Sequence, residues 1–162
     1  MANRTADGHH RRTRHLPHWE EPGATYLLTF CVKRGVPVDL THPGPGRIVV
    51  DALRHFDGER YWLYDYTVMP NHVHAILKPV PADGKMEPLW RITQSLKKWT
   101  ARRINRALGR NGALWQDETY DRIIRDEREY VIRSEYILQN AHTSGLIDDP
   151  TQWPWWGRGS GP

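Results

Sequence analysis

The sequence predicts an α+β fold of the ferredoxin-like sandwich type, in which helices pack on an antiparallel β-sheet. Two runs rich in aromatic and β-branched residues, 26–32 and 61–68, are typical of strands. The turn at Pro70 and Asn71 joins the second run to another strand at residues 72–78, which makes that pair antiparallel. With helical periodicity in residues 47–56 and 87–108 and a further strand near residue 120, the order is strand, helix, strand, strand, helix, strand, then a trailing helix.

Length and composition favour one compact domain. The chain has 162 residues, of which 38% are hydrophobic and 26% charged, and its net charge is +4. This basic excess favours a polyanionic partner. Because Cys31 is the only cysteine, an internal disulfide and a thiolate zinc site are excluded, so a metal would need His and oxygen ligands. No run is apolar enough for a membrane span or a signal peptide, so we expect a cytoplasmic protein without membrane contacts.

Three segments can be distinguished by composition. Residues 1–20 have no hydrophobic period and are expected to form a basic flexible arm, in which Arg12 and Arg14 are candidate DNA contacts; a merely solvated tail is the alternative. Residues 21–147 make up the main domain. Residues 148–162 form a tryptophan-rich tail that we expect to pack on this domain irregularly, with residues 159–162 disordered.

Glycine and proline residues are predicted to end strands and helices in the first half of the chain. Breakers at residues 21–23 and 35–37 bound the first strand. The loop 41–46, Thr-His-Pro-Gly-Pro-Gly, is predicted to exclude regular structure, so the first helix should begin at Arg47 and stop at Asp57 and Gly58. In the strand 72–78 both faces are largely apolar, which predicts a central position in the sheet.

The second helix, at residues 87–108, combines an apolar stripe with basic faces. The stripe consists of Leu89, Ile92, Leu96, Trp99 and Ile104. Residues 88–116 contain no Asp or Glu but seven Lys and Arg, whereas a solvated helix usually alternates charges. We therefore expect this helix to contact a phosphate backbone. The candidate DNA-binding residues on it are Arg91, Lys97, Lys98, Arg102, Arg103 and Arg106.

The last regular segments follow Gly112. A strand is expected around residues 120–124, although its charges weaken the pattern. Asp126, with Glu129 in the reciprocal position, should cap a helix that runs to about Asn140. The apolar side of this helix is expected to include Tyr130, Val131, Ile137 and Leu138.

A candidate metal site begins at His72 and His74. Residues two apart on a strand point to the same face, so the two imidazoles can bind one ion. On the last helix, Asn140 could add a carbonyl oxygen, with Gln139 as the runner-up, and a hard divalent ion suits this set.

Tyr136 is the candidate nucleophile, because it lies four residues before Asn140 and so faces the same site. Tyr120 and Tyr130 are its competitors, and a purely structural tyrosine is the plain alternative. A metal with two neutral imidazoles and an amide keeps most of its charge, which suits an anionic phosphodiester. Attack by a tyrosine would conserve the bond energy as an ester, so the chemistry would be transesterification.

Several segments together resemble the HUH-type single-tyrosine transposases, and among them the REP-associated tyrosine transposases of the IS200-like family. The segments are the first strand from Tyr26 to Phe30, the run Val68-Met-Pro-Asn-His-Val-His-Ala-Ile-Leu77, Trp115 with residues 120–126, Tyr136-Ile-x-x-Asn140, and Gly145-Leu146 with Trp153-Pro-Trp155. They span about residues 20–156 in the expected order. The sequence departs from the family after the Tyr motif, where Asn140 is followed by Ala141 and His142 in place of the family's usual residues. His142 is therefore a candidate neighbour of the site.

The resemblance implies a function for these residues. His72, His74 and Asn140 would bind Mg²⁺ or Mn²⁺, and Tyr136 would cleave single-stranded DNA to leave a 5′-phosphotyrosine and a free 3′-hydroxyl. Residues 21–147 would be an HUH transposase-like catalytic domain that acts on hairpin DNA of dispersed palindromic repeats. The protein would be located at the nucleoid, and a homodimer is possible. Two alternatives stay open: a non-catalytic nucleic-acid-binding module in which Tyr64 and Tyr66 stack on bases, and a metal-dependent phosphohydrolase without a covalent step.

Overall fold

A computed structural model describes residues 20–162. Seven strands, three α-helices and one 3₁₀-helix follow one another in this part of the chain. In order they are β1 (Thr25–Val32), α1 (Pro43–His55), β2 (Tyr61–Val68), β3 (His72–Pro79), β4 (Pro81–Ala82), β5 (Lys85–Met86), α2 (Leu89–Ala107), β6 (Trp115–Ile124), α3 (Glu127–Thr143), η1 (Pro150–Gln152) and β7 (Trp156–Arg158). The predicted arm at residues 1–20, with Arg12 and Arg14, lies almost wholly outside the described residues.

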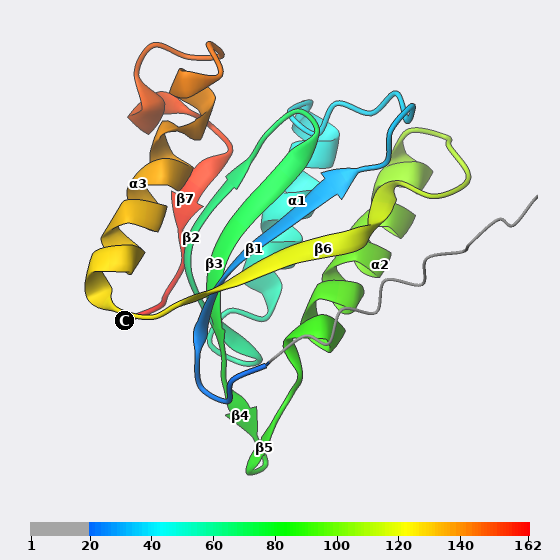
Figure 1. The fold of residues 1–162 in the computed structure, drawn as a ribbon. Coiled ribbons are helices and arrows are strands. Elements are labelled where there is room, and N and C mark those ends of the chain that lie inside the picture. The colour runs from blue at the N-terminus through cyan, green and yellow to red at the C-terminus, as the bar shows by residue number, and fades with distance from the viewer. Residues whose placement is uncertain (1–19) are drawn as a thin grey trace, which may run out of the picture.

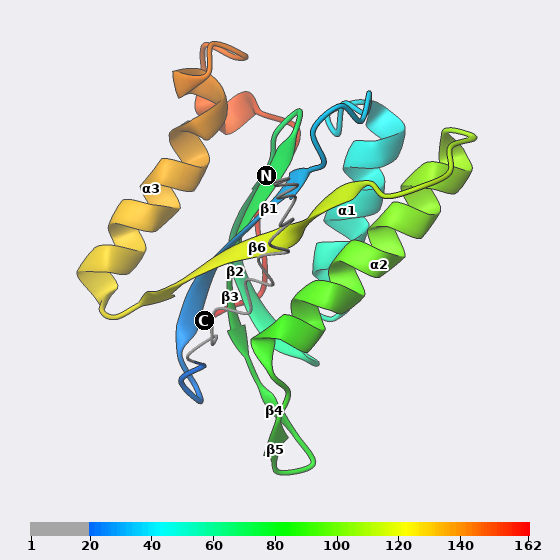
Figure 2. The same cartoon turned by 45° about the vertical axis from the view of Figure 1, so that its right-hand side comes forward.

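Five of the strands form one antiparallel sheet in the order β6-β1-β3-β2-β7. The first four strands in this order have the arrangement of a ferredoxin-like sandwich, so the predicted fold class is confirmed. Figures 1 and 2 show α1 and α2 on one face of the sheet and α3 on the other. As predicted, the strand that begins at His72 is central, with β1 on one side and β2 on the other.

The two faces of the sheet are packed unequally. The main core lies between the sheet and helices α1 and α2, and it includes Leu28, Phe30, Leu63, Val73 and Ile92. The face under α3 holds only a small cluster of Leu27, Ile76, Ile124 and Ile137. Burial of apolar surface therefore holds α1 and α2 firmly, whereas much of the α3 face is free for polar side chains.

The first helix begins earlier than expected. Pro43 is its first residue, so the Pro-Gly-Pro-Gly run belongs to the first turn of α1 and not to an irregular loop. Proline is favoured there because its missing N–H is one that the helix leaves unpaired anyway. Gly46 is required at its position, since a Cβ atom would come within 2.7 Å of the Trp155 ring.

Helix α2 buries a slightly different stripe from the predicted one. Leu89, Ile92, Leu96 and Ile104 are buried, but Trp99 is 40% exposed, contrary to the prediction. Thr100 is buried instead, and its hydroxyl accepts a hydrogen bond of 3.0 Å from the indole of Trp115 on β6. The tryptophan of β6 thus fixes the rotation of α2.

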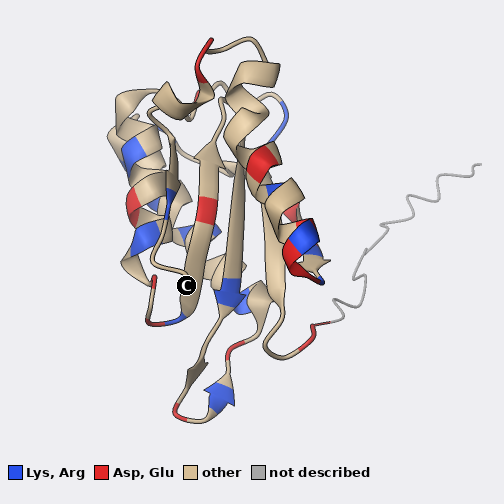
Figure 3. Cartoon of the chain, turned by 90° about the vertical axis from the view of Figure 1, so that its left-hand side faces the viewer, with Lys and Arg blue, Asp and Glu red and all other residues tan. Residues whose placement is uncertain are grey.

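Helix α3 begins as the sequence predicts. The Asp126 carboxylate accepts a hydrogen bond of 2.7 Å from the backbone N–H of Glu129. The Glu129 carboxylate accepts in return from the backbone N–H of Arg125, one residue earlier than the usual capping box. Val131 is exposed, contrary to its predicted place on the apolar side. Acidic and basic residues alternate along this helix (Figure 3), unlike the all-basic α2.

The C-terminal residues add to the sheet. Strand β7 pairs antiparallel with β2, so the irregular packing expected for this segment is replaced by a regular strand. The expected disorder of residues 159–162 is also wrong, because the backbone N–H groups of Gly159 and Gly161 donate to the carbonyls of Tyr64 and Leu63. A Cβ atom on Gly159 would clash with the Leu63 carbonyl oxygen, so only glycine allows this approach.

None of the helices in the described part of the chain is both long and apolar enough to cross a membrane.

Candidate active site

His72 and His74 lie at the start of β3 on the sheet face that α3 covers. Their partners across β1 are Cys31 and Thr29. The two imidazole rings are 4.7 Å apart, centroid to centroid. Two neighbouring imidazoles on one face are what the strand periodicity predicts for residues two apart.

Each imidazole is oriented by a hydrogen bond to its Nδ1 atom. The Nδ1 of His74 lies 2.7 Å from the Thr29 hydroxyl oxygen, and the Nδ1 of His72 lies 2.7 Å from the Asn71 side-chain oxygen. An amide oxygen only accepts, so the Nδ1 of His72 is the donor of that bond. In this tautomer the lone pair of His72 is on Nε2, the atom that would bind a metal ion.

Burial keeps both imidazoles neutral. Burial, with a smaller contribution from the neighbouring His72, lowers the pKa of His74 to about 4. The pKa of His72 is also lowered by burial, an effect that a hydrogen bond with Asn140 partly opposes. Near pH 7 both rings therefore carry the lone pairs that a metal ligand needs.

Helix α3 brings two further side chains to the histidines. The Tyr136 ring lies 5.4 Å from the His74 ring, centroid to centroid. Asn140 is only 9% exposed and hydrogen bonds with His72. The structure therefore brings together His72, His74, Tyr136 and Asn140, which are far apart in the sequence. Tyr136 is 47% exposed, so its phenol is accessible from solvent.

The runner-up residues point elsewhere. The amide of Gln139 donates to Glu135, one turn earlier. His142 contacts the backbone oxygen of Ile147. Tyr130 donates its hydroxyl to the buried Asp65, and burial together with this carboxylate raises the pKa of Tyr130 to about 12. A phenol held in this way is a poor nucleophile. Tyr120 lies on β6, where its hydroxyl contacts Glu118.

The donor set fits a hard divalent cation. Within residues 20–162 no three His, Cys, Asp or Glu side chains gather at one point, so a metal at this site would be bound by two imidazoles and the Asn140 amide oxygen. The side chain of Thr67, the β2 partner of His74, is also buried, and its hydroxyl has no hydrogen-bond partner within this range. A site without carboxylates leaves the charge of the ion available to an anionic substrate.

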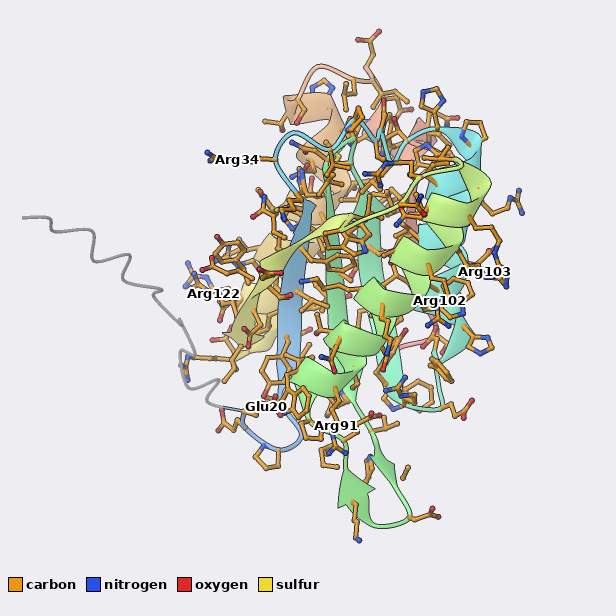
Figure 4. All side chains as sticks on the ribbon, turned by 90° about the vertical axis from the view of Figure 1, so that its right-hand side faces the viewer. Glu20, Arg34, Arg91, Arg102, Arg103 and Arg122 are labelled. Carbon is orange, nitrogen blue, oxygen red and sulfur yellow. The ribbon has the colours of Figure 1, made fainter. Side chains whose placement is uncertain are left out.

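The predicted DNA-binding residues of α2 lie on the other side of the sheet. Arg91, Lys98, Arg102, Arg103 and Arg106 are exposed on α2. Figure 4 shows Arg91, Arg102 and Arg103 projecting from this helix, away from Arg34 and Arg122. Arg91 lies over the Trp90 ring and Arg103 over the Trp99 ring, at 5.3 and 4.6 Å from the ring centroids, so two of the cations are paired with exposed aromatic rings.

Lys97 differs from the other cations of α2. It is half-buried, and its ammonium donates to the backbone oxygens of Gln116 and Asp117 and to the Thr119 hydroxyl. These bonds tie α2 to β6. The ammonium group is therefore already engaged within the protein, in contrast to the exposed Lys98 next to it.

A groove of about 720 Å³ runs between α2 and β6. Its walls include Trp90, Gln94 and Lys98 from α2 and Thr119 from β6. This groove opens at the free edge of the sheet, since β6 is the outermost strand. Lys98 is the exposed cation of α2 that lines this groove.

Thr29 and Asn71 are residues of the site that the sequence did not predict. Asn71 immediately precedes His72, so its role could have been suspected from its position. Thr29 is 45 residues from His74, and only the register of β1 against β3 places it there. No local pattern in the sequence carries that register.

Comparisons with known proteins were made for sequence and for fold. No known family model matches the sequence. An uncharacterised protein of Haemophilus influenzae is 28% identical in an alignment of 165 positions, gaps included, which covers 82% of this chain and 88% of that protein.

Two solved structures resemble the fold. One is a REP-associated tyrosine transposase bound to a REP hairpin, with a TM-score of 0.68, 20% identity and coverage of 85% of this chain and 78% of that chain. The other, described as a transposase from Deinococcus radiodurans, has a TM-score of 0.50, 18% identity and coverage of 79% and 94%. The first is named for the family whose motifs the sequence resembles. The chain therefore has the fold of a REP-associated tyrosine transposase.

Proposed function

We propose that the protein is a metal-dependent single-stranded DNA endonuclease and strand transferase of the REP-associated tyrosine transposase family. It would act on hairpin DNA through a covalent 5′-phosphotyrosine intermediate. The observation that carries this proposal is the contact of the Tyr136 ring with His74, beside the hydrogen-bonded pair His72 and Asn140. A nucleophile, two imidazoles and an amide oxygen on one open sheet face form a set that binding alone does not need.

In the proposed step, the Tyr136 phenolic oxygen attacks the scissile phosphorus atom. The new bond joins the tyrosine oxygen to phosphorus, and the bond from phosphorus to the 3′-oxygen breaks. The phenolic proton leaves to solvent, to which Tyr136 is exposed, and the 3′-oxygen takes up a proton to become a hydroxyl. The phosphotyrosine keeps the ester energy, so a later attack by a 3′-hydroxyl can rejoin a strand.

The residues that would hold Mg²⁺ or Mn²⁺ are His72, His74 and Asn140. When bound, the ion would polarise a phosphoryl oxygen and neutralise charge in the transition state. Thr29 and Asn71 orient the two imidazoles through their Nδ1 atoms. This second layer of contacts supports a ligand role, because metal-binding histidines are usually fixed in this way.

Two features support DNA as the partner. Helix α2 carries five exposed cations, and one of them, Lys98, lines a groove against the outermost strand β6. The REP-associated transposase that shares this fold was solved with a REP hairpin bound. We propose that α2 and its groove contact a hairpin stem and that an adjoining single strand crosses β6 to Tyr136, in a nucleoid-associated, cytoplasmic protein.

The alternative of a non-catalytic binding module is less well supported. It relies on Tyr64 and Tyr66 as base-stacking residues, but Tyr66 is buried and Tyr64 packs against Tyr130 under α3. Neither ring is free to receive a base. The third candidate, a phosphohydrolase without a covalent step, would leave the contact between Tyr136 and His74 without a role.

The test is a covalent-adduct assay. A 5′-labelled and a 3′-labelled hairpin with single-stranded flanks are incubated separately with the protein and Mn²⁺, and the products are separated in SDS. We expect the label to migrate with the protein only when it lies 3′ of the cut, and to do so only without chelator. Cleavage without an adduct would support the phosphohydrolase, and binding without cleavage would support the binding module.

A further inference from the structure

Tyr120 is an exposed aromatic residue in the same row of the sheet as the candidate site. It pairs with Thr29 across β6 and β1, and Thr29 pairs with His74 across β1 and β3. Residues that pair directly across antiparallel strands point to the same face, so Tyr120 shares the face of His74. Strands are spaced about 4.8 Å apart, which puts Tyr120 about 10 Å from His74 along the row.

This part of the sheet face is not covered by α3. The helix packs on β2 and β3, and Tyr120 on the outermost strand is 57% exposed. Among the described residues no aromatic ring or cation is stacked on it. Within residues 20–162 its side chain makes one hydrogen bond, from the hydroxyl to the Glu118 carboxylate at 3.2 Å.

The side of α3 that carries Tyr136 borders this uncovered part of the sheet face. The guanidinium of Arg122 on β6 donates to Glu129 on α3 at 3.0 Å, which shows that this side of the helix faces β6. Tyr136 lies seven residues after Glu129, two turns along the same side. Ile132, between them, is also exposed. Tyr120 on β6 and the candidate nucleophile on α3 therefore lie over the same face of the sheet.

We propose that Tyr120 is a positioning residue, which stacks on the base next to the scissile phosphate and so presents that phosphate to Tyr136. This inference rests on the proposed function. A stacked base is favoured over a phosphate contact, because the neighbouring Glu118 carboxylate repels a phosphate but not a neutral base. Exposed aromatic rings on a sheet are the usual platforms for unpaired bases.

The ring and not the hydroxyl carries this role. In the Tyr136→Phe background, which should keep the DNA intact, Tyr120→Ala should weaken binding of a fluorescein-labelled hairpin with a poly(dA) 5′ flank roughly 5-fold or more. Tyr120→Phe should bind like the parent. The same hairpin without the flank should bind all three proteins equally. Equal binding of the flanked hairpin by Tyr120→Ala would overturn the proposal.

A double-mutant cycle locates the stacked base. Single abasic sites are placed along the flank in turn, and each is measured with the parent and with Tyr120→Ala. At one position, the abasic site should weaken binding by the parent protein as much as the Tyr120→Ala substitution weakens binding of the intact flank. The same abasic site should not weaken binding by the Tyr120→Ala variant any further. Additive losses at every position would show that Tyr120 contacts no base.

Val131→Ala is the matched control, since Val131 is an equally exposed apolar residue about 140° around α3 from Tyr136. It should bind like the parent. The adduct assay on the wild-type protein separates the two proposals: its failure would refute the proposed function. If the adduct forms while Tyr120→Ala binds and reacts normally, only the role of Tyr120 is refuted.

Discussion

The Tyr136 ring stands edge-on to the His74 imidazole, with centroids 5.4 Å apart and ring planes at 67°. The phenol of Tyr136 is exposed, so replacing it should change catalysis and not folding. We predict that Tyr136→Phe binds hairpin DNA like the wild type but forms no SDS-stable adduct. Its free energy of unfolding should change by less than about 0.5 kcal/mol, as is usual for surface substitutions.

The matched control for this variant is Tyr130→Phe, which removes a phenol from the same helix at a site bonded to Asp65. It should still form the adduct. If Tyr136→Phe gave the wild-type yield and another tyrosine variant did not, the nucleophile would have to be reassigned.

Thr29 should matter for metal binding through His74. Its hydroxyl lies 2.7 Å from the Nδ1 of that ring, and outer contacts of this kind hold a ligand in the orientation that the metal needs. We predict that Thr29→Val lowers the affinity for Mn²⁺ about 10- to 100-fold, measured by titration calorimetry. Thr29→Ser, which restores the hydroxyl, should recover most of the affinity. Equal affinities of Thr29→Val and the wild type for Mn²⁺ would show that Thr29 does not support metal binding.

Burial of His74 should make the protein sensitive to acid. The pKa of this ring is about 4 in the folded protein, below its ordinary value of 6.5, so between these values the unfolded chain binds the extra proton. The contribution of the neutral ring to the free energy of unfolding is therefore fully present above about pH 6.5, and it is lost as the pH falls towards 4. The shift corresponds to a loss of roughly 3 kcal/mol in the free energy of unfolding.

Urea unfolding in chelator, at several pH values between about 7 and 4, measures this loss. The variant His74→Gln should show a clearly flatter dependence on pH over the same range. Parallel curves for the two proteins would mean that His74 is not the group responsible.

The sequence predicts the parts of the site that depend on local spacing. His72 and His74 share a face because strands alternate, and Tyr136 and Asn140 share one because helices repeat every 3.6 residues. The prediction that the two pairs meet comes from the further ligand that a two-His metal site needs, and the family resemblance supports it. Periodicity alone does not say which face of the sheet receives α3.

Some environments that the sequence did not predict depend on interactions across the fold. Trp99 fits the helical stripe, but the hydrogen bond between Thr100 and Trp115 turns α2 so that Trp99 is exposed. Lys97 belongs to a basic run, yet β6 supplies three oxygens to its ammonium group. Strand β7 is only three residues long and contains Gly157, so it has no alternating sequence pattern that would predict a strand. In each case the deciding partner is distant in sequence.

The basic face of α2 can be tested by charge reversal. Arg102 is exposed, whereas Lys97 has a structural role, so Arg102 and Lys98 are the suitable positions. We predict that Arg102→Glu weakens hairpin binding, and that the slope of log affinity against log salt becomes shallower by about 0.9 for each phosphate that the variant no longer neutralises. Lys85→Glu, an equal charge change on the exposed strand β5, should leave the slope unchanged. Equal slopes for Arg102→Glu and the wild type would show that α2 is merely solvated.

The bond between Tyr130 and Asp65 should anchor α3 to the sheet. Asp65 is fully buried on β2, and it accepts hydrogen bonds from the Tyr130 hydroxyl at 2.7 Å and from the Arg158 guanidinium at 3.2 Å. Tyr130→Phe removes one donor from a buried carboxylate, so we predict a loss of about 1–3 kcal/mol in the free energy of unfolding. Chemical denaturation near pH 7 measures this loss, with Val131→Ala as the exposed control on the same helix.

Alkaline titration tests the same bond independently. Burial and the Asp65 carboxylate raise the pKa of Tyr130 from 10 to about 12, so the folded protein keeps the phenolic proton that the unfolded chain releases. The stabilisation is complete below about pH 10 and is lost as the pH rises towards 12. Tyr130→Phe should therefore lose less stability than the wild type over this range. If both proteins lost stability in parallel, the hydroxyl of Tyr130 would not be the group that holds α3 to Asp65.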